Sequence, residues 1–175
     1  RFQLGPFRIE TVAVAHSIPD AVALAIQTPV GTVVYTSDFK LEPDPLYGHG
    51  TDLERFRQLG DDGVLLLLGD STNAERAGRS GSERDLAPAF ESIFEQAPGR
   101  IVVATFASNI HRIQAVVSLA AQHGRRLGVV GRSLQNAFKT ATELGFLHVP
   151  DGLVVGNLEK HAEDGRLVLL TAGSQ

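Results

Sequence analysis

The chain has 175 residues, of which 43% are apolar and 21% are charged, and its formal net charge is −4. This length accommodates one domain or parts of two, and the apolar content is sufficient for a packed core. There is no cysteine, which excludes disulfides and thiolate metal sites, and no apolar run approaches the ~20 residues of a membrane helix.

The acidic balance argues against a protein that coats RNA with a basic face. It does not argue against a metallonuclease, whose acidic ligands count as negative charge until the metal binds. The sequence has no Met, so Arg1 is not a natural start, and the last residues stop as a predicted strand ends. We therefore expect a piece of a longer protein, with an open apolar face where the missing half of its first part belongs.

The first part of the chain is predicted to be rich in β-structure. β-branched and apolar runs predict strands over residues 8–15, 22–28 and 32–36. Pro29-Val30-Gly31 supplies a hairpin turn between the last two. In the Pro- and Gly-rich loop 41–50, His49 is expected to be an exposed loop residue and not a ligand. Asp52 is a good N-cap for a short helix that Gly60 ends.

The five apolar residues 64–68 predict a strand that is buried on both faces. They are followed by a polar segment, 74–82, that is rich in Gly and Arg and predicts a domain boundary. We accordingly expect one domain over residues 1–78 and another over residues 79–175.

The second part alternates helices and strands. Helices are predicted over residues 82–96, from Ser108-Asn109 to a point before Gly124, and over 133–144, and strands over 101–106, 127–130, 153–155 and 167–170. This alternation is typical of a parallel, Rossmann-like sheet, so the fold class is α/β.

His16 and Asp38 each follow a strand-like run, and one hairpin between them can return the chain to the same sheet edge. An imidazole and a carboxylate brought together in this way form a divalent metal site, for which zinc and manganese are the natural occupants. For either residue alone, a surface or hydrogen-bonded side chain is the more ordinary interpretation.

Asp70 and His111 also stand near predicted strand ends, which line the ligand crevice of a parallel sheet. Asp70 is open to a second interpretation as a cap or Asx-turn residue, and His111 as a solvated residue of a first helical turn.

Two predicted helix starts have groups suited to anions. Ser108 and Asn109 open one helix, whose free amides and dipole favour negative charge. Arg132 and Ser133 repeat the arrangement at the next strand-to-helix turn and add a guanidinium suited to phosphate. The alternative is that Ser133 is only a cap and Arg132 only solvated. If instead both helix starts bind phosphate, we expect them to face the cleft that holds Asp38. A metal site facing two phosphate-binding helix starts indicates a metal-dependent phosphodiesterase.

Six sequence strings, taken together and in this order, resemble those of bacterial ribonuclease J from about residue 5 to the last residue. They are His-Ser-Ile-Pro-Asp (16–20), Ser-Asp-Phe-Lys (37–40), Gly-Asp-Ser-Thr-Asn (69–73), Phe-Ala-Ser-Asn-Ile-His-Arg-Ile-Gln (106–114), Val-Gly-Arg-Ser (130–133) and Thr-Ala-Gly-Ser-Gln (171–175). The resemblance implies part of a metallo-β-lactamase αββα fold over residues 1–78. It implies an incomplete β-CASP domain over residues 79–175.

The resemblance also implies site roles. His16 matches the third metal motif of the family, and Asp38 the fourth, in which the Asp bridges two zinc or manganese ions. Asp70 and His111 match the first two β-CASP motifs and would be catalytic: Asp70 would orient a ligand histidine or accept a proton, and His111 would act on a phosphate oxygen or the leaving oxygen. Ser37 stands where the family usually has Gly.

The activity implied is metal-dependent RNA hydrolysis in RNA decay and processing, from a 5′-monophosphate end and sometimes internally. The implied setting is the cytoplasm, with RNA as partner, no membrane and commonly a homodimer. The His-x-His-x-Asp-His motif and the last β-CASP motif are absent from this chain. We therefore expect the chain alone to bind metal weakly and to be inactive.

Two alternatives remain. One is a non-catalytic RNA-binding partner subunit of a nuclease, against which the retained His16, Asp38, Asp70 and His111 argue. The other is a metallohydrolase that acts on a small ester, against which the second α/β part argues, because a small substrate needs no second wall.

Overall fold

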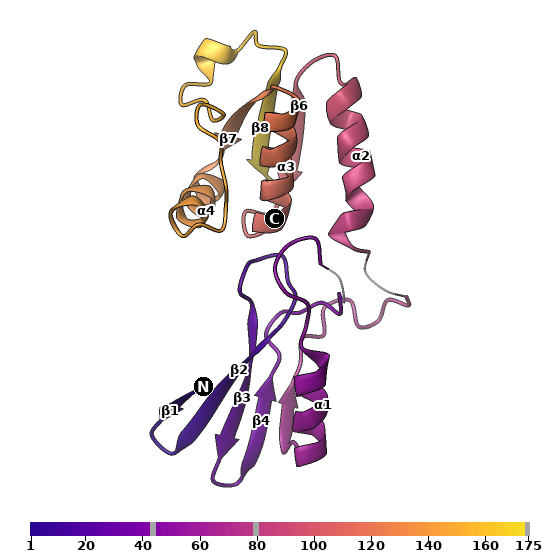
Figure 1. The fold of residues 1–175 in the computed structure, drawn as a ribbon, viewed down its shortest axis with the longest axis vertical. Coiled ribbons are helices and arrows are strands. Elements are labelled where there is room, and N and C mark those ends of the chain that lie inside the picture. Colours follow the sequence, from indigo (N-terminus) through magenta and orange to yellow (C-terminus); the bar gives the residue numbers. More distant parts are fainter. Residues whose placement is uncertain (43–44, 79–80, 174–175) are drawn as a thin grey trace. The chain divides into compact units, whose positions relative to one another are not determined.

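The computed structural model describes residues 1–42, 45–78 and 81–173, and the chain divides into two compact units, Arg1–Ser82 and Glu83–Gln175 (Figure 1). The boundary predicted after residue 78 lies a few residues before this division.

The first unit is a five-stranded sheet with one helix. Its elements are β1 (Phe2–Leu4), β2 (Phe7–Ala13), β3 (Val22–Thr28), β4 (Gly31–Tyr35), α1 (Leu53–Asp62) and β5 (Leu66–Leu68). The strands lie in chain order, antiparallel from β1 to β4, and β5 joins β4 in parallel. Strand β1 was not predicted. It pairs with β2 across a tight turn at Gly5, whose φ of 57° suits a glycine.

Helix α1 covers one face of this sheet (Figure 1). Asp52 is its N-cap, as predicted, because its carboxylate accepts a hydrogen bond from the Arg55 amide at 2.9 Å. The predicted end at Gly60 is wrong: the helix continues to Asp62, and Gly63, with φ of 92°, follows it. The small core joins the helix to the sheet and consists of Val12, Val14, Ala23, Ala25, Val34 and Leu59, with Phe56 packed against it.

The leucines of β5 are not buried, so that prediction is wrong. Within the described chain, the three leucines of β5 are 47% to 62% exposed, and Leu65, just before the strand, is 61% exposed. The reason is position: β5 is the edge strand of the sheet and pairs only with β4. The same observation agrees with the expectation that the first part has an open apolar face.

The second unit is a parallel sheet with helices packed against it, as predicted. Its elements are α2 (Glu83–Gln96), β6 (Ile101–Thr105), α3 (Ile110–Gln122), β7 (Arg126–Val130), α4 (Arg132–Glu143), the short 3-10 helix η1 (Glu159–His161) and β8 (Leu167–Ala172). The strand order is β6-β8-β7, and both pairings are parallel. The strand predicted over residues 153–155 is wrong, since Val154 makes only an isolated bridge to Leu127.

Helix α3 holds the core of this unit together. In Figure 1 it lies over β6 and β8, with α2 on one side and α4 on the other. Ile113, Val116, Val117 and Ala120 are completely buried on its inner face. These spacings of three and four residues form the apolar stripe that the sequence predicted.

Candidate metal and phosphate sites

The loops that carry His16 and Asp38 run beside each other at the ends of β2 and β4. An isolated antiparallel bridge joins Ala15 to Lys40, and the Lys40 amide donates to the Ala15 carbonyl at 2.7 Å. The Nε2 atom of His16 lies 3.9 Å from Oδ2 of Asp38. The two side chains therefore converge, as the hairpin spacing predicted, and one ion contacting both at about 2.0–2.2 Å is compatible with this separation.

Thr51 ties these two loops together. Its hydroxyl accepts a hydrogen bond from the Ala15 amide at 2.9 Å and donates to the Lys40 carbonyl at 2.6 Å. One side chain thus fixes the residue before His16 against the segment that follows Asp38. The sequence reasoning missed Thr51, because a threonine just before a helix cap has no distinguishing local pattern.

Asp70 follows β5 and is held by hydrogen bonds. Its amide donates to the Thr36 hydroxyl at 3.0 Å, and its carboxylate accepts from the Thr72 amide at 2.8 Å, which is an Asx-turn contact. The Thr72 side chain and amide, the Phe39 amide and the nearby His16 all lower the pKa of Asp70, the Thr72 side chain most strongly. Asp70 is therefore both the turn residue of one interpretation and a neighbour of the loop that carries Asp38.

The donor set of the first unit fits part of a metal site. His16 is 28% exposed, and its Nδ1 is buried without a hydrogen-bond partner among the described residues, whereas Asp38 is 77% exposed. The other ring nitrogen, Nε2, is the one that faces the Asp38 carboxylate, and an imidazole nitrogen beside a carboxylate suits zinc or manganese. In the described segments no three His, Asp or Glu side chains are grouped closely enough to hold an ion. The chain thus presents a partial ligand shell.

Ser37 adopts the left-handed conformation, with φ of 57°. Only glycine takes this conformation without cost, which explains why a glycine suits the position before Asp38.

In the second unit, the start of α3 is already capped. The Asn109 side chain accepts a hydrogen bond from the Arg112 amide at 3.0 Å, and Asn109 is buried. Its oxygen therefore serves the helix first, which weakens the case for Asn109 as a phosphate ligand. Ser108 beside it is exposed, and His111 is half-buried in the first turn.

The start of α4 is open. Gly131, with φ of 98°, occupies the cap position and offers no side chain, so the prediction that Ser133 opens the helix is wrong by one residue. Arg132 and Ser133 are exposed, and neither side chain has a hydrogen bond or ion pair within the described part of the chain. Free amides and a guanidinium at one helix start fit an anion.

The two helix starts are separated by β8, which lies between β6 and β7. The sequence reasoning treated them as neighbours because it took strand order from chain order. Neighbouring strands lie about 4.8 Å apart, so the ends of β6 and β7 are roughly 10 Å apart. That is a spacing for two phosphate groups and not for one. Of the string over 171–175, residues 174–175 lie outside the described chain.

No helix in the described residues is both long enough and apolar enough to cross a membrane.

Residues 98–175 match the family model described as the β-CASP domain of ribonuclease J. Named relatives cover nearly the whole chain. Ribonuclease J of Helicobacter pylori is 40% identical over 98% of this chain, that of Thermus thermophilus is 43% identical over 100%, and that of Mycolicibacterium smegmatis is 45% identical over 99%.

The chain spans 25% of the length of the first of these relatives and 31% of each of the other two. A solved structure, a protein of unknown function from Enterococcus faecalis, matches 99% of this chain and 43% of its own with a TM-score of 0.64 and 18% identity. At this identity the likeness concerns the fold alone, and it covers both units.

Proposed function

We propose that the whole protein is a metal-dependent ribonuclease. Two similarities support this proposal: named ribonuclease J proteins match nearly the whole chain, and residues 98–175 match the β-CASP domain of ribonuclease J. The observation that carries the proposal is the convergence of His16 and Asp38 at 3.9 Å, at strand ends, with the carboxylate of Asp70 tied to the same loop. Sequence similarity supports RNA as the substrate class, and the positions of these side chains support metal-dependent chemistry.

The residues of the first unit would hold the metal. His16 would donate a ring nitrogen, Asp38 would donate its carboxylate oxygens, and Asp70 would keep a negative charge close by. Two divalent ions, zinc or manganese, would activate water and polarise the scissile phosphate when bound. The remaining ligands would come from the protein outside this chain, which is why we expect the chain alone to be inactive.

The residues of the second unit would contact RNA. Arg132, Ser133 and the open amides of α4 would bind backbone phosphates, and Ser108 would add a hydroxyl contact. His111 would donate a proton to a phosphate oxygen or to the leaving oxygen. These groups recognise phosphate and not base edges, so sequence selectivity should be weak.

We also propose 5′-to-3′ exonuclease action with some endonuclease action, a homodimer and a cytoplasmic setting, all from the likeness to ribonuclease J.

The test uses the full-length protein and its Asp38→Ala variant, with Asp61→Ala, an exposed aspartate of α1, as the matched control. Zinc and manganese content and cleavage of a 5′-monophosphorylated RNA are measured on each. Asp38→Ala should lose metal and abolish cleavage, and the control should lose neither. Cleavage by metal-free protein, or full activity in Asp38→Ala, would refute the proposal.

A second comparison separates the two RNA roles. His111→Ala should lower kcat much more than it weakens RNA binding, because a group that acts on the scissile phosphate matters most in the transition state. Arg132→Ala should instead weaken binding and reduce its salt dependence by one phosphate contact. Equal, small effects would mean that both are ordinary surface residues. RNA binding without any cleavage in the wild type would favour the non-catalytic subunit instead.

A further inference from the structure

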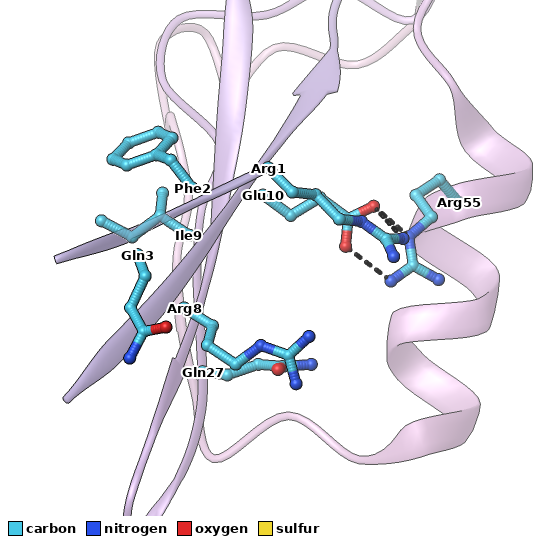
Figure 2. A pocket seen from close by; sticks show the side chains of 8 residues that line it. All are labelled: Arg1, Phe2, Gln3, Arg8, Ile9, Glu10, Gln27 and Arg55. Carbon is cyan, nitrogen blue, oxygen red and sulfur yellow. Dashed lines mark hydrogen bonds and ion pairs between the residues drawn. The ribbon is translucent and has the colours of Figure 1, made fainter.

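The sheet face beneath α1 is apolar at Val12, which belongs to the core of the first unit. Toward the beginning of β2 the side chains are polar, and Figure 2 shows Glu10 and Arg8 there. Side chains two residues apart on a strand share a face. On β2 the buried Val12 is therefore followed, on the same face, by Glu10 and then Arg8. The polar end of this face is not part of the packed core.

A row of polar side chains crosses three strands at this end. Arg8 on β2 pairs in register with Gln3 on β1 and with Gln27 on β3. Directly cross-strand neighbours point to the same face, with Cβ atoms about 5 Å apart. The Gln3 amide donates to the Gly5 carbonyl at 3.1 Å, whereas Figure 2 shows the Gln27 side chain beside the Arg8 guanidinium. The Gln27 amide can therefore donate hydrogen bonds next to this guanidinium.

An ion-pair network forms the adjoining wall. Glu10 receives two hydrogen bonds from Arg55 of α1, both at 2.9 Å, and one from Arg1 at 2.8 Å (Figure 2). The hydrogen bond from the Arg55 side chain is the main reason that the pKa of Glu10 lies below its usual value. The bidentate pair fixes α1 against the sheet and so holds the wall in place.

The charges do not balance. Three guanidiniums face one carboxylate, and Arg8 has no hydrogen bond or ion pair within the described chain. The first unit as a whole is acidic, with seven Lys and Arg against eleven Asp and Glu. A cationic excess in an acidic unit is local, and it surrounds a cavity of about 330 Å³.

We propose that this pocket is a phosphate-binding site, separate from the site of His16 and Asp38. It lies at the beginning of β2, whereas His16 follows the end of that strand. Arg8, whose guanidinium has no partner among the described residues, takes the phosphate, and the Gln27 amide adds a contact. Arg55 contributes charge while it remains paired with Glu10. The phosphate comes either from an RNA strand bound away from the cleavage site or from a free nucleotide or phosphate ion.

The test uses metal-free, full-length protein, so that RNA is not cleaved and the result is independent of nuclease activity. Arg8→Gln is compared with Arg57→Gln, a matched loss of an exposed charge on α1, where Arg57 pairs with Glu54 outside the pocket. Binding of inorganic phosphate is measured by titration. Binding of a single-stranded oligoribonucleotide is measured at several salt concentrations.

Arg8→Gln should weaken phosphate binding about 10-fold, as expected for one charge-assisted contact, and Arg57→Gln should not. If the source is RNA, Arg8→Gln should also lower the slope of log affinity against log salt by about 0.7. If the source is a free phosphate or nucleotide, the slope should stay the same. Equal effects of the two variants on phosphate binding would overturn the proposal, because they would mean a general charge effect.

Discussion

At the scale of residues, three carboxylates of the first unit differ in exposure and in their hydrogen-bond partners. Asp38 is exposed and placed beside an imidazole, whereas Asp70 accepts hydrogen bonds that lower its pKa and keep it ionised. Glu10 is anchored by a bidentate guanidinium and lies away from both. Glu10 is thus fixed by its ion pairs, whereas Asp38 stays open to solvent.

The anchoring of Glu10 predicts a pH effect. A carboxyl group whose pKa is lower in the folded protein contributes stability above its unfolded pKa, and this contribution is lost as the pH falls through the folded value. For Glu10 the loss therefore begins below its ordinary pKa of about 4.5. Arg55→Gln should raise the pKa of Glu10 more than Arg1→Gln does, because the Arg55 hydrogen bond is the larger cause. Carboxyl carbon NMR titration of labelled glutamate measures both, and a larger effect from Arg1→Gln would contradict the assignment.

At the scale of elements, single side chains fix the ends of helices and loops. Thr51 joins the loops after β2 and β4, and Arg125, which is only 8% exposed, donates to the carbonyls of Ala97 and Gly99 just after α2. Neither contact is local in sequence. Each closes a place where a helix or a strand would otherwise leave its backbone groups without partners.

Thr51→Val should weaken metal binding by the full-length protein about 10-fold or more, as other residues that orient metal ligands do. The change keeps the side-chain shape and removes both hydrogen bonds. Metal titration measures the effect, and Thr51→Ser, which keeps the hydroxyl, should restore most of the affinity. A Thr51→Ser variant as weak as Thr51→Val would indicate a packing role for the methyl group.

Arg125→Met should destabilise the second unit by about 1–3 kcal/mol, because it leaves the partly buried carbonyls of Ala97 and Gly99 without this donor. Its neighbour Arg126 is the control: it is exposed and lies 3.7 Å from Asp164, so Arg126→Met should cost only about 0–1 kcal/mol. Hydrogen exchange of the α2 and α3 amides reports the local free energy of unfolding. Equal protection in the two variants would show that the Arg125 contacts contribute little.

At the scale of the whole molecule, the chain spans only 25% to 31% of the length of these relatives. The relatives are about three to four times longer than the matched part. The strand that ends the first sheet is made of leucines whose side chains are exposed. Apolar side chains of this kind are normally buried, so we expect the rest of the protein to cover them.

This expectation is tested with Leu65→Lys combined with Leu67→Lys. Each leucine contributes about 1.5–3 kcal/mol when buried, so the double change should destabilise the full-length protein by roughly 3–6 kcal/mol. Leu144→Lys, at an exposed position beyond α4, should cost almost nothing. Chemical unfolding measures the three proteins. If the double variant were as stable as the control, β5 would be an exposed edge in the whole protein too.

Local patterns were sufficient for much of this fold. The alternation of apolar runs and turns predicted β2, β3, β4 and the alternating helices and strands of the second unit, and Asp52 was identified as a cap from its place before α1. The convergence of His16 and Asp38 was also predictable, since one hairpin between two strand ends returns the chain to the same edge. These features depend on residues that are close in sequence.

The remaining features depend on contacts that are distant in sequence. The position of β8 between β6 and β7, the edge position of β5 and the contacts of Thr51 are decided by which strands and loops pair in space. A run of five apolar residues looks the same whether its strand is central or at an edge, and a threonine looks the same with or without two distant partners. The sequence by itself thus determined the elements and the chemistry of the candidate residues. The tertiary structure alone decided their neighbours, because pairing between distant segments depends on the burial and hydrogen bonding of the whole unit.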